Sequence, residues 1–227
     1  MKYIELTTTV MLKRQIYFAD SGYIIGKNIN KLMLLDKELK ELHPKKDYKN
    51  YVFNNFFPLE KDKFYKKNKL YIFRIRGLNL EFMQKVYSCL QILDSDDFEV
   101  ISVAKNEIEQ KCIKELYTVT PMIVTEDNKP WLQNDDLELF ISRIEANLEK
   151  KYKSFFNEDI DIKGRFIKSL SFKNRVPMYF NYKGIKLLGN KVSIQIQNNE
   201  EAQKIAFLAT AVGIGEKNSS VGAGFCD

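Results

Sequence analysis

The chain has 227 residues, of which 44% are hydrophobic, so it can bury one large core or two small ones without a disulfide framework. Its three cysteines are widely spaced and it has one histidine, which excludes a cysteine and histidine zinc cluster. The sequence has no secretory signal pattern and no run of about 18 apolar residues, so we expect a soluble, cytoplasmic protein without a membrane partner.

The net charge of +6 is concentrated in two basic blocks. Residues 45–76 and residues 151–191 each hold 10 basic and 3 acidic side chains, whereas residues 126–150 hold 7 acidic and 3 basic ones. Aromatic residues are interleaved with the cations of both blocks. Cations that neutralise phosphates beside rings that stack on bases suit single-stranded RNA, although aromatics at strand spacing also fill cores.

The first half of the chain predicts a β-α-β-β-α-β order, that of a ferredoxin-like domain. Strands are expected at residues 2–12, 51–57, 70–76 and 98–103. Apolar residues at helical spacing predict helices at residues 26–43 and 80–90, and Pro44 stops the first of them. His43 is therefore expected at a helix C-terminus.

The second half predicts the same order less clearly. Asp135 and Asp136 signal the start of a long helix. Strands are expected at residues 113–124, 161–172, 177–182, 191–197 and 222–226, one hairpin more than the pattern needs, and a helix at residues 200–212. We predict an α+β fold of two tandem ferredoxin-like (β-α-β-β-α-β) domains, residues 1–110 with a candidate catalytic helix and residues 111–227 with a glycine-rich loop.

Four of the ten glycines lie within twelve positions near the end of the sequence, at Gly213, Gly215, Gly222 and Gly224. Glycine permits positive φ and close backbone approach, so exposed N–H groups here are expected to bind phosphate oxygens. The segment follows a helix and precedes a strand, the reverse of a dinucleotide fingerprint, and it lacks the Gly-Lys-Ser/Thr of a P-loop. From the residues alone, a turn that binds no ligand is the alternative.

The run AVGIGEKNSSVGAGF, residues 211–225, closely resembles the C-terminal glycine-rich signature of the Cas6 family of CRISPR repeat-processing endoribonucleases, in the RAMP superfamily. Residues 120–124, TPMIV, resemble the segment that enters the second domain of that family. The resemblance implies two ferredoxin-like domains and a metal-independent endoribonuclease, with no cofactor, that cleaves precursor crRNA within CRISPR repeats.

The resemblance also implies a catalytic histidine near the end of the first helix and a lysine about six residues later. His43 and Lys49 stand at these places. By itself, a lone surface histidine is usually inert. Some family members use a tyrosine upstream in the same helix, but here the expected region holds Asn28, and Tyr23 lies nearer the helix start. A catalytic tyrosine is therefore not predicted.

Cutting RNA without metal needs a base that takes the proton from a 2′-hydroxyl and an acid that protonates the departing 5′-oxygen. Histidine serves either role near neutral pH. We expect His43 to be the general base or acid, and Lys49, helped by Lys46 or Lys45, to stabilise the charge of the transition state. The products would carry a 2′,3′-cyclic phosphate and a 5′-hydroxyl.

Two groups of residues are candidates for binding the repeat RNA. The second basic block offers Lys163, Arg165, Lys168, Lys173 and Arg175, although a hairpin exposed to water is an equal alternative. The glycine-rich loop offers Gly213, Gly215, Lys217, Ser219, Ser220, Gly222 and Gly224. Such contacts position RNA without reading its sequence.

Three other hypotheses remain. One is a non-catalytic RAMP subunit that binds RNA within a CRISPR effector complex, and another is a nucleotide- or phosphate-binding regulator that forms a ferredoxin-like dimer. A magnesium nuclease would use the carboxylates at residues 94–97 or 159–161, but solvated turns explain these runs better. The sequence does not decide between a monomer and a homodimer.

Overall fold

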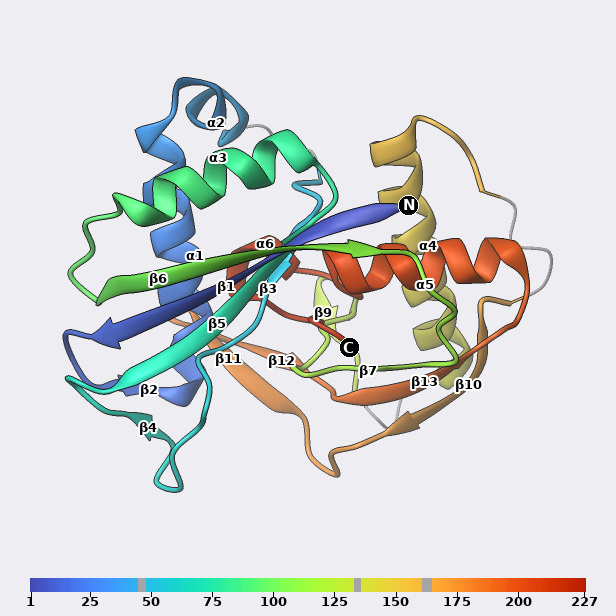
Figure 1. Cartoon of the computed structure of the whole chain (residues 1–227). Helices are drawn as coiled ribbons and strands as arrows, with labels where there is room; N and C mark the ends of the chain where they lie inside the picture. Colours follow the sequence, from blue (N-terminus) through green and yellow to red (C-terminus); the bar gives the residue numbers. More distant parts are fainter. Residues whose placement is uncertain (45–47, 133–135, 161–164) are drawn as a thin grey trace.

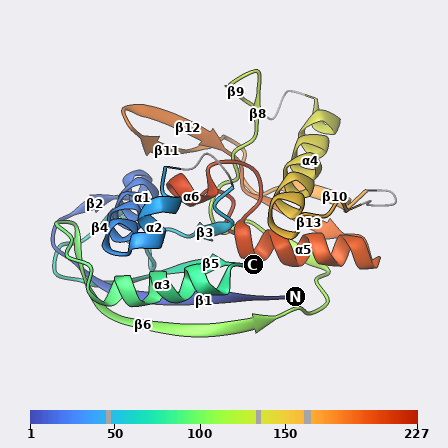
Figure 2. The ribbon, with the colours of Figure 1, turned by 90° about the horizontal axis from the view of Figure 1, so that it is seen from above.

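The computed structural model describes residues 1–44, 48–132, 136–160 and 165–227. The two halves of the chain lie side by side, with the short helix α6 (Asn218–Val221) between them (Figures 1 and 2). Among the described residues, no helix combines the length and the apolar character that crossing a membrane requires.

The first half is a four-stranded antiparallel sheet with helices on one face. The strand order is β3-β5-β1-β6, and α1 and α3 lie on the same side of β1 and β6 (Figure 2). Its elements are β1 (Lys2–Leu12), β2 (Ile16–Tyr17), η1 (Phe18–Asp20), α1 (Ser21–Leu32), η2 (Met33–Leu35), α2 (Lys37–Leu42), β3 (Tyr51–Phe53), β4 (Phe64–Tyr65), β5 (Leu70–Gly77), α3 (Leu80–Gln91) and β6 (Phe98–Glu109). The predicted strands at 2–12 and 70–76 and the helix at 80–90 are confirmed by β1, β5 and α3.

The prediction of one helix over residues 26–43 is wrong at its start and in its continuity. α1 begins at Ser21, and the chain leaves the helix again at Asp36. Asp36 is extended, with φ −120° and ψ 137°, and its side chain accepts hydrogen bonds from the N–H groups of Glu38 and Leu39. An aspartate that caps a new helix in this way ends the preceding one. His43 is the C-cap residue of α2, as the sequence predicts.

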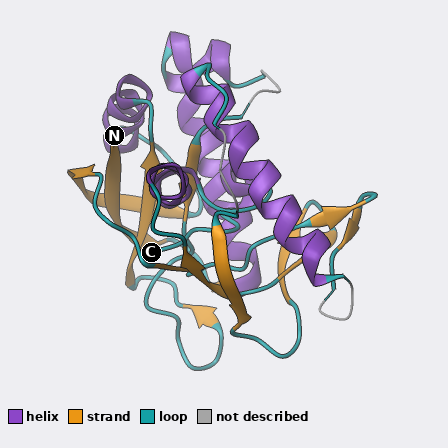
Figure 3. Ribbon diagram, turned by 90° about the vertical axis from the view of Figure 1, so that its right-hand side faces the viewer, coloured by secondary structure: helices purple, strands orange, loops and turns teal. Residues whose placement is uncertain are grey.

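As far as the structure describes it, the second half has a smaller sheet, three helices and two hairpins outside the sheet. The three strands are ordered β10-β13-β7, and Figure 3 views this half from its own side, with a long helix running obliquely past the strands. Its elements are β7 (Glu115–Tyr117), β8 (Thr125–Glu126), β9 (Lys129–Pro130), α4 (Leu137–Phe156), β10 (Ile167–Phe172), β11 (Met178–Tyr182), β12 (Ile185–Gly189), β13 (Val192–Ile196), α5 (Glu200–Val212) and α6. Asp136 caps α4 through the N–H of Glu138, whereas Asp135 lies outside the described residues.

Two predicted strands of this half are corrected by the structure. The strand at 113–124 is reduced to β7 and isolated bridges at Thr118, Met122 and Ile123. The strand at 222–226 is absent from the described chain, which has only a bridge between Thr118 and Cys226 there. Both Gly222 and Gly224 have positive φ, so the backbone turns where an extended strand was expected.

The extra hairpin, β11 and β12, lies outside the sheet and packs on the first half. Asn181 of β11 donates a hydrogen bond to the carboxylate of Asp20, at 2.7 Å, and the rings of Tyr182 and Tyr23 meet edge to face. β12 was missed in the sequence. The hairpin therefore helps to hold α1 against the second half.

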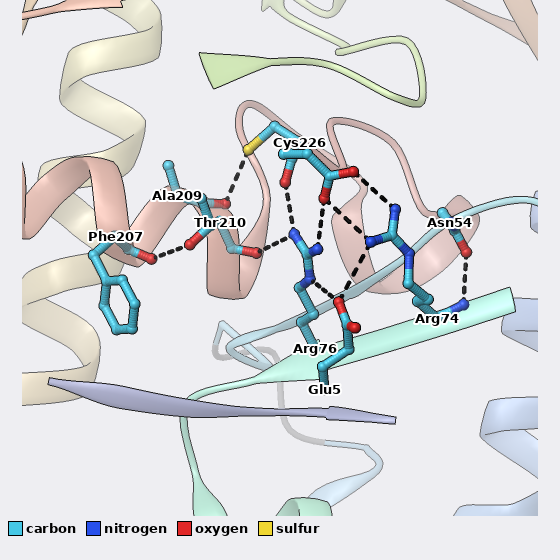
Figure 4. A network of polar contacts seen from close by, with 9 residues as sticks. Glu5, Asn54, Arg74, Arg76, Phe207, Ala209, Thr210 and Cys226 are labelled. Carbon is cyan, nitrogen blue, oxygen red and sulfur yellow. Dashed lines mark hydrogen bonds and ion pairs between the residues drawn. The ribbon is translucent and has the colours of Figure 1, made fainter. Parts of the chain in front are cut away.

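A buried ionic cluster joins the end of the chain to the first sheet (Figure 4). Arg76 of β5 donates to the carboxylate of Glu5, to the carbonyl of Cys226 and to the carboxylate of Asp227, at 2.6, 2.7 and 2.5 Å. Its guanidinium also lies 4.3 Å from the ring centre of Phe225. Burial disfavours the ionised form of Asp227, but the hydrogen bonds and charges of Arg74 and Arg76 outweigh burial and lower its pKa. The cluster fixes the segment that follows the last glycine.

Candidate functional site

The glycine-rich segment folds into a buried turn around α6. Gly213, Gly215, Gly222 and Gly224 are all buried and have φ between 67° and 80°. A Cβ atom on Gly224 would lie 1.8 Å from the carbonyl oxygen of Ile214, so only glycine fits there. Between the two glycine pairs, Lys217 is exposed and Ser219 and Ser220 are half-buried. The segment therefore presents its tip, and not its glycines, to solvent.

The glycine amides are largely used within the protein. Gly213, Gly222 and Gly224 donate their N–H groups to the carbonyls of Ala209, Asn218 and Pro121 respectively. These three N–H groups are thus not available to phosphate in this conformation. What the glycines provide is the shape of the turn.

Lys151 of α4 holds this turn in place through hydrogen bonds. Its side chain is buried, with 2% exposure, and its ammonium donates to the carbonyls of Gly213 and Gly215 and to the side-chain oxygen of Asn218, at 2.8, 2.9 and 2.7 Å. Burial lowers the pKa of Lys151 to about 7, against the smaller opposing effects of Cys226 and Glu216. All three ammonium protons have acceptors, and a neutral amine, which has two N–H groups, could donate to only two of these oxygens.

Two glycines of α1 seat α6 against the first half. A Cβ atom on Gly22 would lie 2.2 Å from the carbonyl oxygen of Val221, and one on Gly26 would lie 2.3 Å from that of Ser220. Glycines four residues apart share one face of a helix, so α1 has a flat side on which α6 rests. The hydroxyl of Tyr51 also donates to the carbonyl of Ser219.

Above this turn lies a cleft of about 830 Å³ between the two halves of the chain. The loop before β3 and the turn around α6 line one side of it, and α4 and the β8–β9 hairpin line the other. The residues that line it are Tyr48, Lys49, Asn50, Tyr51, Val124, Thr125, Asp127, Asn128, Arg143, Ala146, Asn147, Lys150, Lys151, Ser154, Val212, Gly215, Glu216, Lys217, Asn218, Ser219 and Ser220. The cleft is therefore lined both by the candidate catalytic residue Lys49 and by the tip of the glycine-rich segment.

His43 and Lys49 are neighbours at the end of α2. The Lys49 ammonium donates to the carbonyls of Leu42 and His43, at 2.5 and 3.1 Å, so it also caps the C-terminus of that helix. Lys49 lines the cleft, whereas His43 is half-buried just outside the set of lining residues. Lys45 and Lys46 lie outside the described residues.

Asn28, which stands where some family members have a tyrosine, is buried in an ionic network on the far side of α1. Its amide donates to the carboxylate of Asp97 at 2.9 Å, and Arg14 and Lys27 bind the same carboxylate. The Asp97 side chain is 3% exposed, so the interpretation of residues 94–97 as a wholly solvated turn is corrected at this position. Burial disfavours its charge, but the hydrogen bonds of Asn28, Arg14 and Lys27 lower its pKa.

The described cations of the second basic block that the sequence offers for RNA binding lie apart from the cleft. Arg165 is exposed and paired with Glu138 of α4. Lys168, Lys173 and Arg175 are exposed on β10 and the loop that follows it, and none of these side chains lines the cleft. Lys163 lies outside the described residues. The structure thus separates the two groups of residues that the sequence offers for RNA binding.

The cleft wall formed by α4 was not predicted from the sequence. Arg143, Asn147 and Lys150 are spaced by four and three residues, so they share one helical face, and that face lines the cleft. The signal was their shared helical face, which lies beside the apolar stripe of Ile144 and Leu148. In the described parts of the chain, no group of three or more histidine, cysteine, aspartate or glutamate side chains is placed to hold a metal ion.

Comparisons with known proteins agree with the resemblance of residues 211–225. The family model for CRISPR associated protein Cas6, C-terminal, matches residues 103–227, more than half of the chain. The CRISPR-associated endoribonuclease Cas6 2 of Methanocaldococcus jannaschii is 29% identical over 213 residues, covering 85% of this chain and 86% of the relative.

Solved structures share the fold over the whole chain. One described as CRISPR associated protein Cas6 superposes with a TM-score of 0.75 at 18% identity, and one described as an RAMP protein binding different RNA substrates superposes with 0.73 at 15%. Each match covers 99% of this chain and 98% of the other. The chain therefore belongs to the Cas6 family of CRISPR-associated proteins.

Proposed function

We propose that this chain is an endoribonuclease that binds CRISPR repeat RNA and cleaves precursor crRNA within the repeats. Membership of the Cas6 family and the name of the archaeal relative support this activity. The observation that carries the proposal is the cleft, which is lined both by Lys49, adjoining His43, and by Lys217, Ser219 and Ser220 of the glycine-rich segment.

The proposed chemistry needs no metal. His43 either takes the proton of the 2′-hydroxyl or gives one to the leaving 5′-oxygen, water makes the other proton transfer, and the 2′-oxygen attacks the adjacent phosphate. Lys49, with Lys46 as a second cation, stabilises the negative charge that develops on the phosphate. The bond to the 5′-oxygen breaks, so one product ends in a 2′,3′-cyclic phosphate and the other begins with a 5′-hydroxyl.

The proposed RNA-binding residues divide by location. Lys217, Ser219 and Ser220 contact the RNA backbone at the cleft, and the glycines of the segment hold the turn that presents them. The exposed cations of β10 and its loop extend the path of the RNA outside the cleft; they are Arg165, Lys168, Lys173 and Arg175.

We further propose that residues 1–110 and 111–227 are two ferredoxin-like domains. The first half has the strand order β3-β5-β1-β6 with α1 and α3 on one face. In the second half the order β10-β13-β7 continues through the bridge between Thr118 and Cys226, which supports the same arrangement with an inserted hairpin.

Replacement of His43 tests the catalytic proposal. His43→Ala should slow repeat-RNA cleavage by about 10² to 10⁴-fold, the usual effect of losing an acid or base, while the affinity for RNA changes little. Single-turnover rates and filter-binding affinities measure the two effects. Lys40→Ala, which removes an exposed side chain from the same short helix, is the control. Undiminished cleavage by His43→Ala would remove His43 from the mechanism.

One observation favours a second candidate function, a non-catalytic RNA-binding subunit of a CRISPR effector complex. His43 is not among the residues that line the cleft, and Asn28 is engaged with Asp97 and adds no acid or base to it. The similar fold of an RAMP protein that binds RNA fits this alternative. Tight binding of repeat RNA by the wild-type protein without cleavage would favour it.

A further inference from the structure

Helix α4 presents two exposed cations to the cleft that the mechanism above does not use. Arg143 and Lys150 are exposed, line the cleft, and make no ion pair or hydrogen bond through their side chains with other residues that the structure describes. Other cations of α4 are engaged, since Lys153 pairs with Asp159 at 2.7 Å and Lys151 is buried under the turn. Cations on a concave surface without partners favour an anionic ligand.

The charges across the cleft strengthen this preference. Lys217 and Lys49 add positive charge to the opposite side. One carboxylate oxygen of Glu216 accepts hydrogen bonds from the backbone N–H and the hydroxyl of Thr125, at 3.0 and 2.8 Å, and no ion pair joins Glu216 to Arg143 or Lys150. Asp127 and Glu216 are the carboxylates that line the cleft, and the lining lysines and arginine outnumber them, so the cleft has a net positive charge.

Two further groups in the cleft suit a nucleotide more than a simple anion. The ring of Tyr48 lines the cleft and is 41% exposed, so a base can stack on it. Asn147, between Arg143 and Lys150 on the same helical face, has a buried side-chain oxygen with no hydrogen-bond partner among the described residues. Such an unmet acceptor fits a ligand that brings hydroxyl or amino donors.

We propose that this face of α4 is a binding surface for an unpaired RNA strand, with Arg143 and Lys150 on phosphates and Tyr48 stacked on a base. The proposal rests on the proposed function, because it names where the RNA lies in the same cleft. Unpaired RNA is the expected ligand because a base within a duplex stacks on its neighbours and does not offer its face to Tyr48.

The salt dependence of RNA binding tests the phosphate contacts. For single strands the slope of log K against log salt is about −0.7 per phosphate contact, so Arg143→Gln/Lys150→Gln should reduce its magnitude by about 1.4. Its affinity for an unpaired repeat oligonucleotide should fall about tenfold or more. The control Lys153→Gln/Lys204→Gln removes the same charge from two cations that pair with Asp159 and Glu200 outside the cleft. A slope and affinity equal to those of the control would overturn the proposal.

Base stacking is tested at Tyr48. Tyr48→Ala should weaken binding of the unpaired oligonucleotide about tenfold, whereas Tyr48→Phe, which keeps the ring, should bind like the wild type. An equal loss of affinity for a duplex of the same sequence would overturn the assignment to unpaired RNA.

Binding and cleavage separate this inference from the proposed function. If the wild-type protein binds RNA but does not cleave it, the proposed endoribonuclease activity is contradicted. The comparison of salt slopes then still tests whether the α4 surface binds RNA. Normal cleavage with unchanged binding by the double variant overturns the α4 surface alone. A wild-type protein that binds no RNA overturns both.

Discussion

Lys151 is the residue on which the shape of the glycine-rich segment most depends. It lies on the buried face of α4, in line with Ile144 and Leu148 at four- and three-residue spacing. That spacing was visible in the sequence, but a buried role for Lys151 was not predicted from it. The acceptors themselves were not predictable, because they come from residues more than 60 positions away.

Lys151→Met should destabilise the protein by about 2 kcal/mol near pH 7, because three oxygens lose their hydrogen-bond donor while the side-chain volume is kept. Urea unfolding measures this free energy. Lys150→Met, next in sequence and exposed in the cleft, is the matched control and should cost little. A cost no greater than that of Lys150→Met would contradict the anchoring role.

The effect of Lys151→Met on the free energy of unfolding should also depend on pH. The pKa of Lys151 is about 7 in the folded protein and returns to its higher ordinary value on unfolding. Between these values the unfolded chain binds more protons, so the contribution of Lys151 to stability is lowest and constant below pH 7 and rises with pH above 7. The stability difference between wild type and Lys151→Met should therefore grow from pH 6.5 to pH 9. A constant difference would show that Lys151 keeps its ordinary pKa.

At the scale of elements, α1 and α6 show which features of a helix or turn a local sequence pattern predicts and which it does not. The apolar period placed a helix in this region, but it did not indicate the break at Asp36, where a side-chain cap competes with helix continuation. The clustered glycines indicated positive φ angles and close backbone approach at residues 213–224. The strand expected at residues 222–226 nevertheless does not form. Gly22 and Gly26 carried a signal for close helix packing that the sequence analysis did not use.

Gly26→Ala tests the contact between α1 and α6. An added Cβ would lie 2.3 Å from the carbonyl oxygen of Ser220, so the variant should lose about 1–3 kcal/mol through overpacking, although alanine favours a helix. Thermal unfolding measures the loss, and repeat-RNA affinity should fall because Ser219 and Ser220 shift. Lys31→Ala, on the exposed side of α1, serves as the control. Greater stability in Gly26→Ala, as helix propensity alone predicts, would refute tight packing.

Across the whole molecule, contacts between the halves were beyond the reach of the sequence analysis. The strand and helix order gave the general architecture because each element follows from local periodicity. The cleft and the buried cluster of Arg76 did not follow from local patterns. The Arg76 cluster joins residues of β5, α5 and the last two positions, and no local period relates these segments. Arg165, Lys168, Lys173 and Arg175 were proposed from the basic composition of their block alone, and they lie outside the cleft.

Arg76→Met tests the connection between the halves. Removing a 6% exposed guanidinium leaves Glu5 and Asp227 without their closest partner, so the protein should lose about 3–5 kcal/mol. Arg74→Met, which also loses a pair with Asp227 but is 25% exposed, should cost clearly less. Urea unfolding of both variants makes the comparison. Equal costs would mean that burial of Arg76 does not set the strength of the cluster.

The central claim, an RNA endonuclease whose own side chains perform the chemistry, is tested most directly by incubating end-labelled repeat RNA with the wild-type protein in excess EDTA. We predict cleavage within the repeat, with a 2′,3′-cyclic phosphate on one product and a 5′-hydroxyl on the other. Cleavage that requires added magnesium, or products with 5′-phosphates, would contradict the account.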